Sequence, residues 1–199
     1  MEITKGRRVL MAGLVACLSL VLGFALTACG PSDEEQVKKA LDDELSTMVN
    51  PSDEVISQLA SEAESGASGQ LTQMGVNSTD LVKSWLDGYS YEIGDIAVDG
   101  DSATAQVTIT CKQFLPIATD WSNSLMSDVQ SKGFTSTDEI YAYAGQTLMS
   151  DLDAATPAST EVTFTCQKDG NGWTFPQTAD NQKALYTAML GGDASSLLG

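Results

Sequence analysis

The side chains of this sequence that could carry chemistry are four cysteines, five tyrosines and a large excess of carboxylates. Because the sequence contains no histidine, it offers neither a Ser-His-Asp or Cys-His nucleophile arrangement nor an ordinary zinc site. Lysine, tyrosine and carboxylate groups remain available for proton transfer. We therefore expect no metal site and no cofactor, and acid–base chemistry is the enzymatic possibility that stays open.

The first 28 residues have the composition of an export signal. Lys5, Arg7 and Arg8 form a cationic start, and residues 9–26 are nearly all apolar and carry no charge. A cationic start, an apolar stretch and small residues before a cleavage point are typical of a secretory signal peptide. The apolar stretch is also about long enough to span a bilayer, so a retained transmembrane anchor is the alternative.

The apolar stretch ends in Leu26-Thr27-Ala28-Cys29, which resembles the lipobox of bacterial lipoproteins. The resemblance implies cleavage between Ala28 and Cys29 and a diacylglyceryl group on the Cys29 thiol. Two acyl chains of palmitate type give stable anchoring, whereas a single chain gives only marginal binding. We expect a protein on the outer face of the cell membrane, with residues 29–33 as a lipidated tether and residues 34–199 as one domain.

The charge of the mature chain limits its partners. Removing residues 1–28 takes away Glu2, Lys5, Arg7 and Arg8 and leaves 26 acidic and 7 basic residues, a net charge of −19. A charge this negative opposes contact with nucleic-acid phosphates and anionic lipid headgroups. We expect a monomer that meets the membrane through its lipid anchor only and binds no nucleic acid. A solvated acidic surface and a site for a cationic partner both remain open.

Helical spacing of apolar residues dominates two parts of the mature chain. The first part, residues 33–86, carries a capping-box pattern from Ser32 to Glu35 and a helix start at Pro51. The second part, residues 116–155, has apolar residues spaced by three or four and a second capping box from Ser136 to Glu139. A last, weaker helical pattern covers residues 179–190.

Period-two alternation predicts two β-hairpins. Residues 89–98 and 102–114 flank the turn Asp99-Gly100-Asp101, and residues 161–168 and 173–176 flank a second Gly-rich turn. In the long return strand, alternate residues from Ala103 to Cys111 are apolar and those between them are polar. This alternation is typical of an antiparallel sheet with one buried face.

The two hairpins carry a family resemblance. Residues 91–105, Tyr-Glu-Ile-Gly-Asp-Ile-Ala-Val-Asp-Gly-Asp-Ser-Ala-Thr-Ala, resemble the first hairpin of small cystatin-like or NTF2-like lipoproteins of Gram-positive bacteria. Residues 169–175, Asp-Gly-Asn-Gly-Trp-Thr-Phe, resemble their last hairpin. The resemblance implies an α+β fold in which N-terminal helices pack on a curved antiparallel sheet of about four strands. The helical insertion between the two hairpins is longer than is usual in that family.

Two cysteines of the mature domain could form a disulfide. Cys111 and Cys166 close near-identical strand patterns, Val-Thr-Ile-Thr-Cys and Val-Thr-Phe-Thr-Cys, and each lies on the apolar face of its strand. Exported domains permit oxidation, and neighbouring strands would let the two side chains meet. We therefore predict a Cys111–Cys166 disulfide, with a pair of buried free thiols as the alternative.

Tyrosines and an aspartate supply the candidates for a pocket. Some relatives of the NTF2-like fold use an aspartate and tyrosines in an apolar cavity for proton transfer. Here the available groups are Tyr89, Tyr91, Asp95, Tyr141 and Tyr143. Alternation places Tyr89 and Tyr91 on one strand face, where they would equally line the core. The aspartates at the hairpin turns lack the complete calcium-loop spacing and suit turn hydrogen bonding instead.

Two classes of function are consistent with these observations. The first is a noncatalytic envelope lipoprotein that binds a small molecule, a peptide or a protein, or has a structural role. The second is a small-molecule enzyme of the cyclase or isomerase kind that uses an Asp/Tyr pocket. A carboxylate buried among tyrosines would favour the enzyme, and a filled sheet face would favour the binding module.

The lipobox yields the first prediction. Replacing Cys29→Ala removes the thiol that would accept lipid, so both lipidation and leader removal at this site should be lost. Mass spectrometry of the membrane fraction measures both outcomes. Detection of an intact leader on the unmodified protein, or of an unmodified Cys29 at the mature N-terminus, would contradict the assignment.

Overall fold

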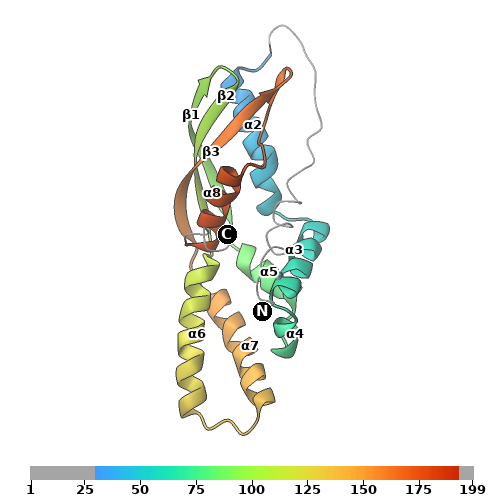
Figure 1. Cartoon of the computed structure of the whole chain (residues 1–199), viewed down its shortest axis with the longest axis vertical. Coiled ribbons are helices and arrows are strands. Elements are labelled where there is room, and N and C mark those ends of the chain that lie inside the picture. The colour runs from blue at the N-terminus through green and yellow to red at the C-terminus, as the bar shows by residue number, and fades with distance from the viewer. Residues whose placement is uncertain (1–29, 193–199) are drawn as a thin grey trace.

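The computed structural model describes residues 30–192 and shows helices packed on one antiparallel sheet (Figure 1). Within these residues there are seven α-helices, one 3-10 helix and four strands in the spatial order β1-β2-β3-β4. The predicted α+β class, the four-stranded sheet and the helical insertion are confirmed. The elements are α2 (Asp33–Leu45), η1 (Ser46–Met48), α3 (Asp53–Gly66), α4 (Gln70–Gln73), α5 (Ser78–Leu86), β1 (Ser90–Asp99), β2 (Ser102–Cys111), α6 (Phe114–Ser131), α7 (Thr137–Ala154), β3 (Ala158–Asp169), β4 (Gly172–Thr174) and α8 (Ala179–Leu190).

One face of the sheet is buried and the other is open. Residues 103, 105, 107, 109 and 111 of β2 are buried, whereas the residues between them are exposed or half-buried. Helix α2 lies against β1 and β4, and α8 lies against β3 and β2, so both helices cover the apolar face. The polar face carries rows such as Gln106 beside Thr163 and Thr110 beside Ser159, which hydrogen bond across β2 and β3. The alternation in the sequence therefore predicted the burial correctly.

A buried asparagine completes the edge of β3 beyond the short strand β4. Thr165 donates its backbone N–H to Asn181 Oδ1 at 2.9 Å and accepts from Asn181 Nδ2 at 2.8 Å. The second Nδ2 hydrogen reaches the Pro176 carbonyl oxygen at 2.8 Å. Because all of these polar groups are satisfied, the side chain of Asn181 can be buried without an unpaired donor. It also fixes the start of α8 against the sheet.

The molecule is elongated, and its two ends differ. At one end lie the β1–β2 and β3–β4 turns and the start of α2; at the other lies the connection between α6 and α7 (Figure 1). The first end is held together by Asp33, whose carboxylate accepts from Trp173 Nε1 at 2.9 Å and from Lys168 Nζ at 3.2 Å. We call the first end the turn end and the second, formed by the helical hairpin of α6 and α7, the hairpin end.

No helix within residues 30–192 has the length and apolar character needed to cross a membrane.

The predicted disulfide is wrong. Cys111 and Cys166 are both free and buried. Strands β2 and β3 are neighbours, but they run antiparallel, so Cys166 pairs with Ala103 while Cys111 pairs with Ala158. Ala103 lies eight residues before Cys111 on the same strand, about 27 Å away. A disulfide needs Cα atoms within about 7 Å. Instead, the Cys111 thiol donates to the Ala188 carbonyl oxygen of α8 at 3.4 Å.

A glycine in α7 allows the α4–α5 connection to pack against this helix. A Cβ atom placed on Gly145 would lie 2.1 Å from the Met74 carbonyl oxygen and 3.0 Å from Val76 Cγ2. The closer of these neighbours is backbone, so a side chain here would push the whole connection away from α7. The tight packing fixes the position of residues 74–76 relative to the helix.

Gly145→Ala should destabilise the fold. Alanine is the better helix former by about 1 kcal/mol, but the clash with the Met74 carbonyl should outweigh that gain and leave a net loss of about 2 kcal/mol. Urea unfolding measures the difference. Ser150→Ala, at an exposed position of the same helix, is the control and should be neutral or slightly stabilising. Equal stabilisation by both variants would contradict the packing described here.

Candidate functional site

The predicted tyrosine–aspartate group is not assembled in one place. Tyr89 is buried just before β1, and its ring lies 6.4 Å from the ring of Tyr91. The hydroxyl of Tyr91 donates to Asp42 of α2 at 2.5 Å. Asp95 is exposed and lies where the register of β1 shifts, between Ile93 and Ile96. Of Tyr89, Tyr91 and Asp95, only the two tyrosines therefore lie close together.

The other two predicted tyrosines lie in the helical half of the molecule. Tyr141 is 37% exposed on α7. Tyr143, two residues later, donates its hydroxyl to Asp128 of α6 and packs its ring 5.3 Å from that of Phe134. The hydrogen bond to Asp128 raises the pKa of Tyr143 because the phenol donates to a carboxylate. These contacts tie the two helices of the hairpin together.

Tyr89 is buried and weakly acidic. Burial is the main cause that raises the pKa of its hydroxyl, and the nearby Cys111 and Tyr91 add to the effect. Among the residues that the structure describes, its oxygen has no hydrogen-bond partner. Burial also raises the pKa of the Cys111 thiol to about 11. Neither group is ionised near neutral pH, so neither is an activated nucleophile or base.

A titratable group that the sequence analysis missed is Glu44. It lies on the buried face of α2 together with Leu41 and Leu45, and its side chain is 6% exposed. Burial raises its pKa to about 7, and the nearby charge of Asp43 adds to the shift. The signal was available, because position 44 falls three residues after Leu41 in the apolar helical spacing.

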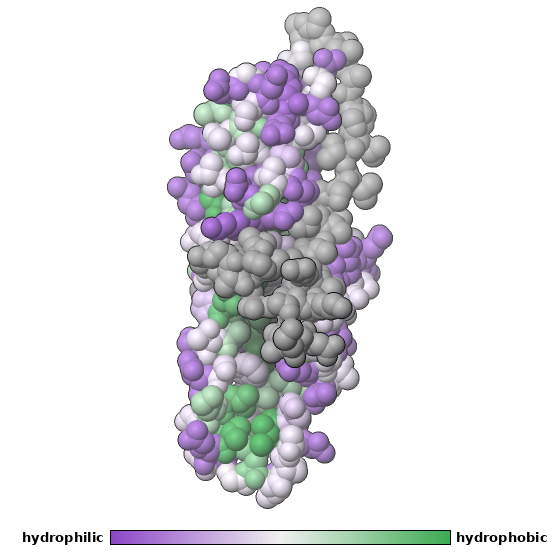
Figure 2. Space-filling model, in the orientation of Figure 1, coloured by the Kyte–Doolittle hydropathy of each residue, from purple (hydrophilic) through white to green (hydrophobic). Residues whose placement is uncertain are grey.

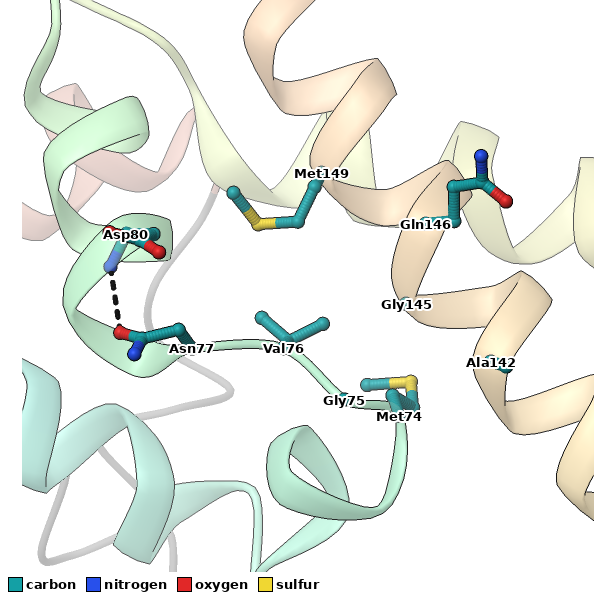
Figure 3. Close-up of a pocket in the computed structure, with 9 residues that line it drawn as sticks. All are labelled: Met74, Gly75, Val76, Asn77, Asp80, Ala142, Gly145, Gln146 and Met149. Carbon is teal, nitrogen blue, oxygen red and sulfur yellow. Dashed lines mark hydrogen bonds between the residues drawn. The ribbon is translucent and has the colours of Figure 1, made fainter.

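A hollow of about 420 Å³ lies between the α4–α5 connection and α7 (Figure 3). Its apolar lining comes from Met74, Val76 and Met149, and its polar lining includes Asn77 and Asp80. No tyrosine is among the described residues that line it. Within the described part of the chain, no group of three or more carboxylate or thiol side chains gathers to hold a metal ion.

The hairpin end carries apolar side chains that the core does not cover. None of the 18 residues of α6 is buried, and Met126 is 64% exposed. Figure 2 shows apolar residues gathered over this end of the molecule. We call the following set the distal cluster; all of its members are exposed or half-buried, and none packs against the main core: Leu125, Met126, Val129, Phe134, Ile140 and Tyr143.

Polar contacts hold the tip of this hairpin in shape. Lys132 lies 5.2 Å from the centre of the Tyr143 ring and 3.8 Å from Asp128. At the start of α7, Thr135 donates its backbone N–H to Glu139 at 2.8 Å, and Glu139 donates its own N–H to Ser136 at 3.2 Å. Ser136 is therefore the N-cap of α7, as predicted, but the reciprocal bond of a capping box is replaced, because the Glu139 carboxylate accepts from Thr135, one residue before the cap. The distal cluster is therefore presented on a defined helical turn.

Comparison with known proteins gave one structural likeness. No family model and no curated protein matches the sequence. A solved structure of "a putative lipoprotein (ycdA)" from Bacillus subtilis subsp. subtilis str. 168 is similar with a TM-score of 0.44 and 14% sequence identity. The match covers 90% of this chain and 55% of that chain, so this chain spans little more than half of that protein's length. The predicted cleavage and lipidation site, Ala28 and Cys29, lies outside the described residues.

Glu44 yields a pH prediction. Its pKa is raised on folding, so the folded state favours the protonated form. The stability that this contributes is complete below about pH 4.5 and is lost as the pH rises through about 7. Glu44→Gln removes the ionisation and should therefore stabilise the protein at pH 8 by about 2 kcal/mol, with little effect at pH 4.

Urea unfolding at several pH values tests this expectation. Glu34→Gln, at an exposed position of the same helix, serves as the control, because it removes one carboxylate without changing the buried face of α2. If the difference between Glu44→Gln and the unchanged protein were the same at pH 4 and pH 8, Glu44 would not titrate as described.

Proposed function

We propose that this protein is a lipid-anchored, noncatalytic module of the cell envelope that binds a protein partner through its hairpin end. The lipobox resemblance supports the anchor at Cys29. The scattered positions of the predicted Asp/Tyr group and the filled apolar face of the sheet support a binding role over catalysis. A cystatin-like or NTF2-like relationship belongs to the same proposal, supported by the two antiparallel hairpins with helices on one face.

The orientation that the anchor would give the molecule relative to the membrane supports this role. The chain enters the described domain at the turn end, where Asp33 ties the start of α2 to Lys168 and Trp173. A lipid on Cys29, four residues before Asp33, would place the turn end next to the membrane. The hairpin end would then face away from it, at the far end of an elongated molecule (Figure 1). An interaction surface in this position is accessible to other proteins.

The distal cluster is the observation that carries the proposal. A contiguous apolar patch on the surface of an otherwise acidic monomer more often marks an interaction site than a surface without a function. The patch is flanked by Asp128, Asp138 and Glu139, with Lys132 as the basic residue of the same segment. We infer a partner that presents apolar side chains among basic ones, because such a surface complements the apolar character of the patch and the negative charge around it.

Photo-crosslinking from position 126 tests the proposed function. A photoreactive phenylalanine in place of Met126, in cells that produce the protein naturally, should yield a discrete adduct with one protein. The same residue in place of Val49, an apolar side chain that is 41% exposed outside the hairpin, is the matched control and should yield none.

Once the crosslinked partner has been identified, a charge substitution tests the same surface. Met126→Glu should leave the fold intact, because the side chain is already mostly exposed, and should weaken binding of the crosslinked partner about tenfold or more. Val49→Glu should leave that affinity unchanged. Adducts of equal yield from positions 126 and 49, or a partner whose affinity ignores Met126→Glu, would refute the assignment.

A further inference from the structure

The hollow beside α7 is a second surface feature, separate from the distal cluster. Its residues come from two segments, the α4–α5 connection with the start of α5, and the middle of α7. Figure 3 shows Met149 extending from α7 over Val76 of the connection. Its volume of about 420 Å³ falls in the range of small-molecule sites. The hollow does not involve the hairpin tip, so a ligand bound there would be independent of the proposed function.

The floor of the hollow is apolar and fixed in position. Val76 is buried, and Met74 and Met149 pack against the main core. The backbone of the connection rests directly on Gly145, which leaves no freedom for the two walls to approach further. Thioether side chains adapt to ligands of different shape. The hollow thus offers a preformed apolar surface to an aliphatic group.

One charge defines the polarity of the hollow. Among the described residues that line it, Asp80 is the sole ionisable one. Asp80 donates its backbone N–H to Asn77 at 3.2 Å (Figure 3), and within residues 30–192 its carboxylate makes no ion pair or side-chain hydrogen bond. The lining contributed by residues 30–192 contains no lysine. With a formal net charge of −17 for the whole chain, the site attracts cations and repels anions.

We propose that this hollow binds an ammonium group carried on a short aliphatic chain. The Asp80 carboxylate accepts hydrogen bonds from the ammonium at the rim. The aliphatic chain lies over Val76 between the thioethers of Met74 and Met149. A fatty acid has the wrong charge, and an alcohol of the same length lacks the charge-assisted hydrogen bond.

Methyl NMR of the mature protein tests this proposal. The probes are hexylammonium, hexanol and hexanoate, and the reporters are the methionine methyl groups, assigned with Met74→Leu and Met149→Leu. Hexylammonium should shift the methyls of Met74 and Met149 in a saturable way and leave that of Met126 unchanged. It should bind about tenfold more tightly than hexanol, and hexanoate should not bind. Blocked lysine, as Nα-acetyl-lysine methylamide, distinguishes a lysine side chain from a free amine as the source of the group.

Two variants that each remove one negative charge distinguish binding at Asp80 from a general attraction of cations to the acidic protein. Asp80→Asn should weaken hexylammonium binding about tenfold, to the level of hexanol. Asp180→Asn, in the first turn of α8 and away from the hollow, should change the affinity less than twofold. The proposal is overturned if hexylammonium leaves the Met74 and Met149 methyls unshifted, if hexanoate binds equally well, or if both variants weaken binding to the same extent.

Discussion

The antiparallel pairing of β2 with β3 is the constraint on which the rest of the structure depends. The register runs without interruption from Ser102 opposite Gln167 to Cys111 opposite Ala158. The chain therefore leaves β2 and returns to β3 at adjacent points on the same end of the sheet. Residues 112–157 must travel out and back, which they do as the α6–α7 hairpin. The same pairing places the β1–β2 and β3–β4 turns at the turn end, beside the start of α2, and so gives the molecule two different ends.

Much of the fold could be predicted because local signals and tertiary packing agree. Apolar alternation in β2 marks the face that α2 and α8 cover, and the capping-box patterns that begin at Ser32 and Ser136 mark real helix starts, each with the serine as N-cap. Strand direction carries no such local signal. Two strands that each carry a cysteine at or near their C-terminal end bring those cysteines together only if they run parallel, whereas β2 and β3 are antiparallel. The alternation placed Cys111 and Cys166 on the correct face but could not determine their separation.

The candidate sites were less predictable, for a physical reason. Helical spacing identifies an apolar face but does not reveal whether another element covers it. In α6 the same face packs against α7 and the core near Trp121, whereas around Leu125 and Val129 it is left half-exposed. The hollow likewise depends on residues from two distant segments, among them Asp80 and Met149, whose approach results from how α5 and α7 pack. Neither feature has a sequence motif.

The central claim, that the anchored end and the interaction end are opposite, can be measured in reconstituted vesicles. Fluorescent labels on Asn171→Cys at the turn end and on Ser131→Cys at the hairpin end should differ in energy transfer to acceptors on the lipid headgroups. Cys111 and Cys166 are buried and should not take the label in the folded protein. The account predicts strong transfer from position 171 and weak transfer from position 131. Equal transfer from both positions, or stronger transfer from position 131, would contradict it.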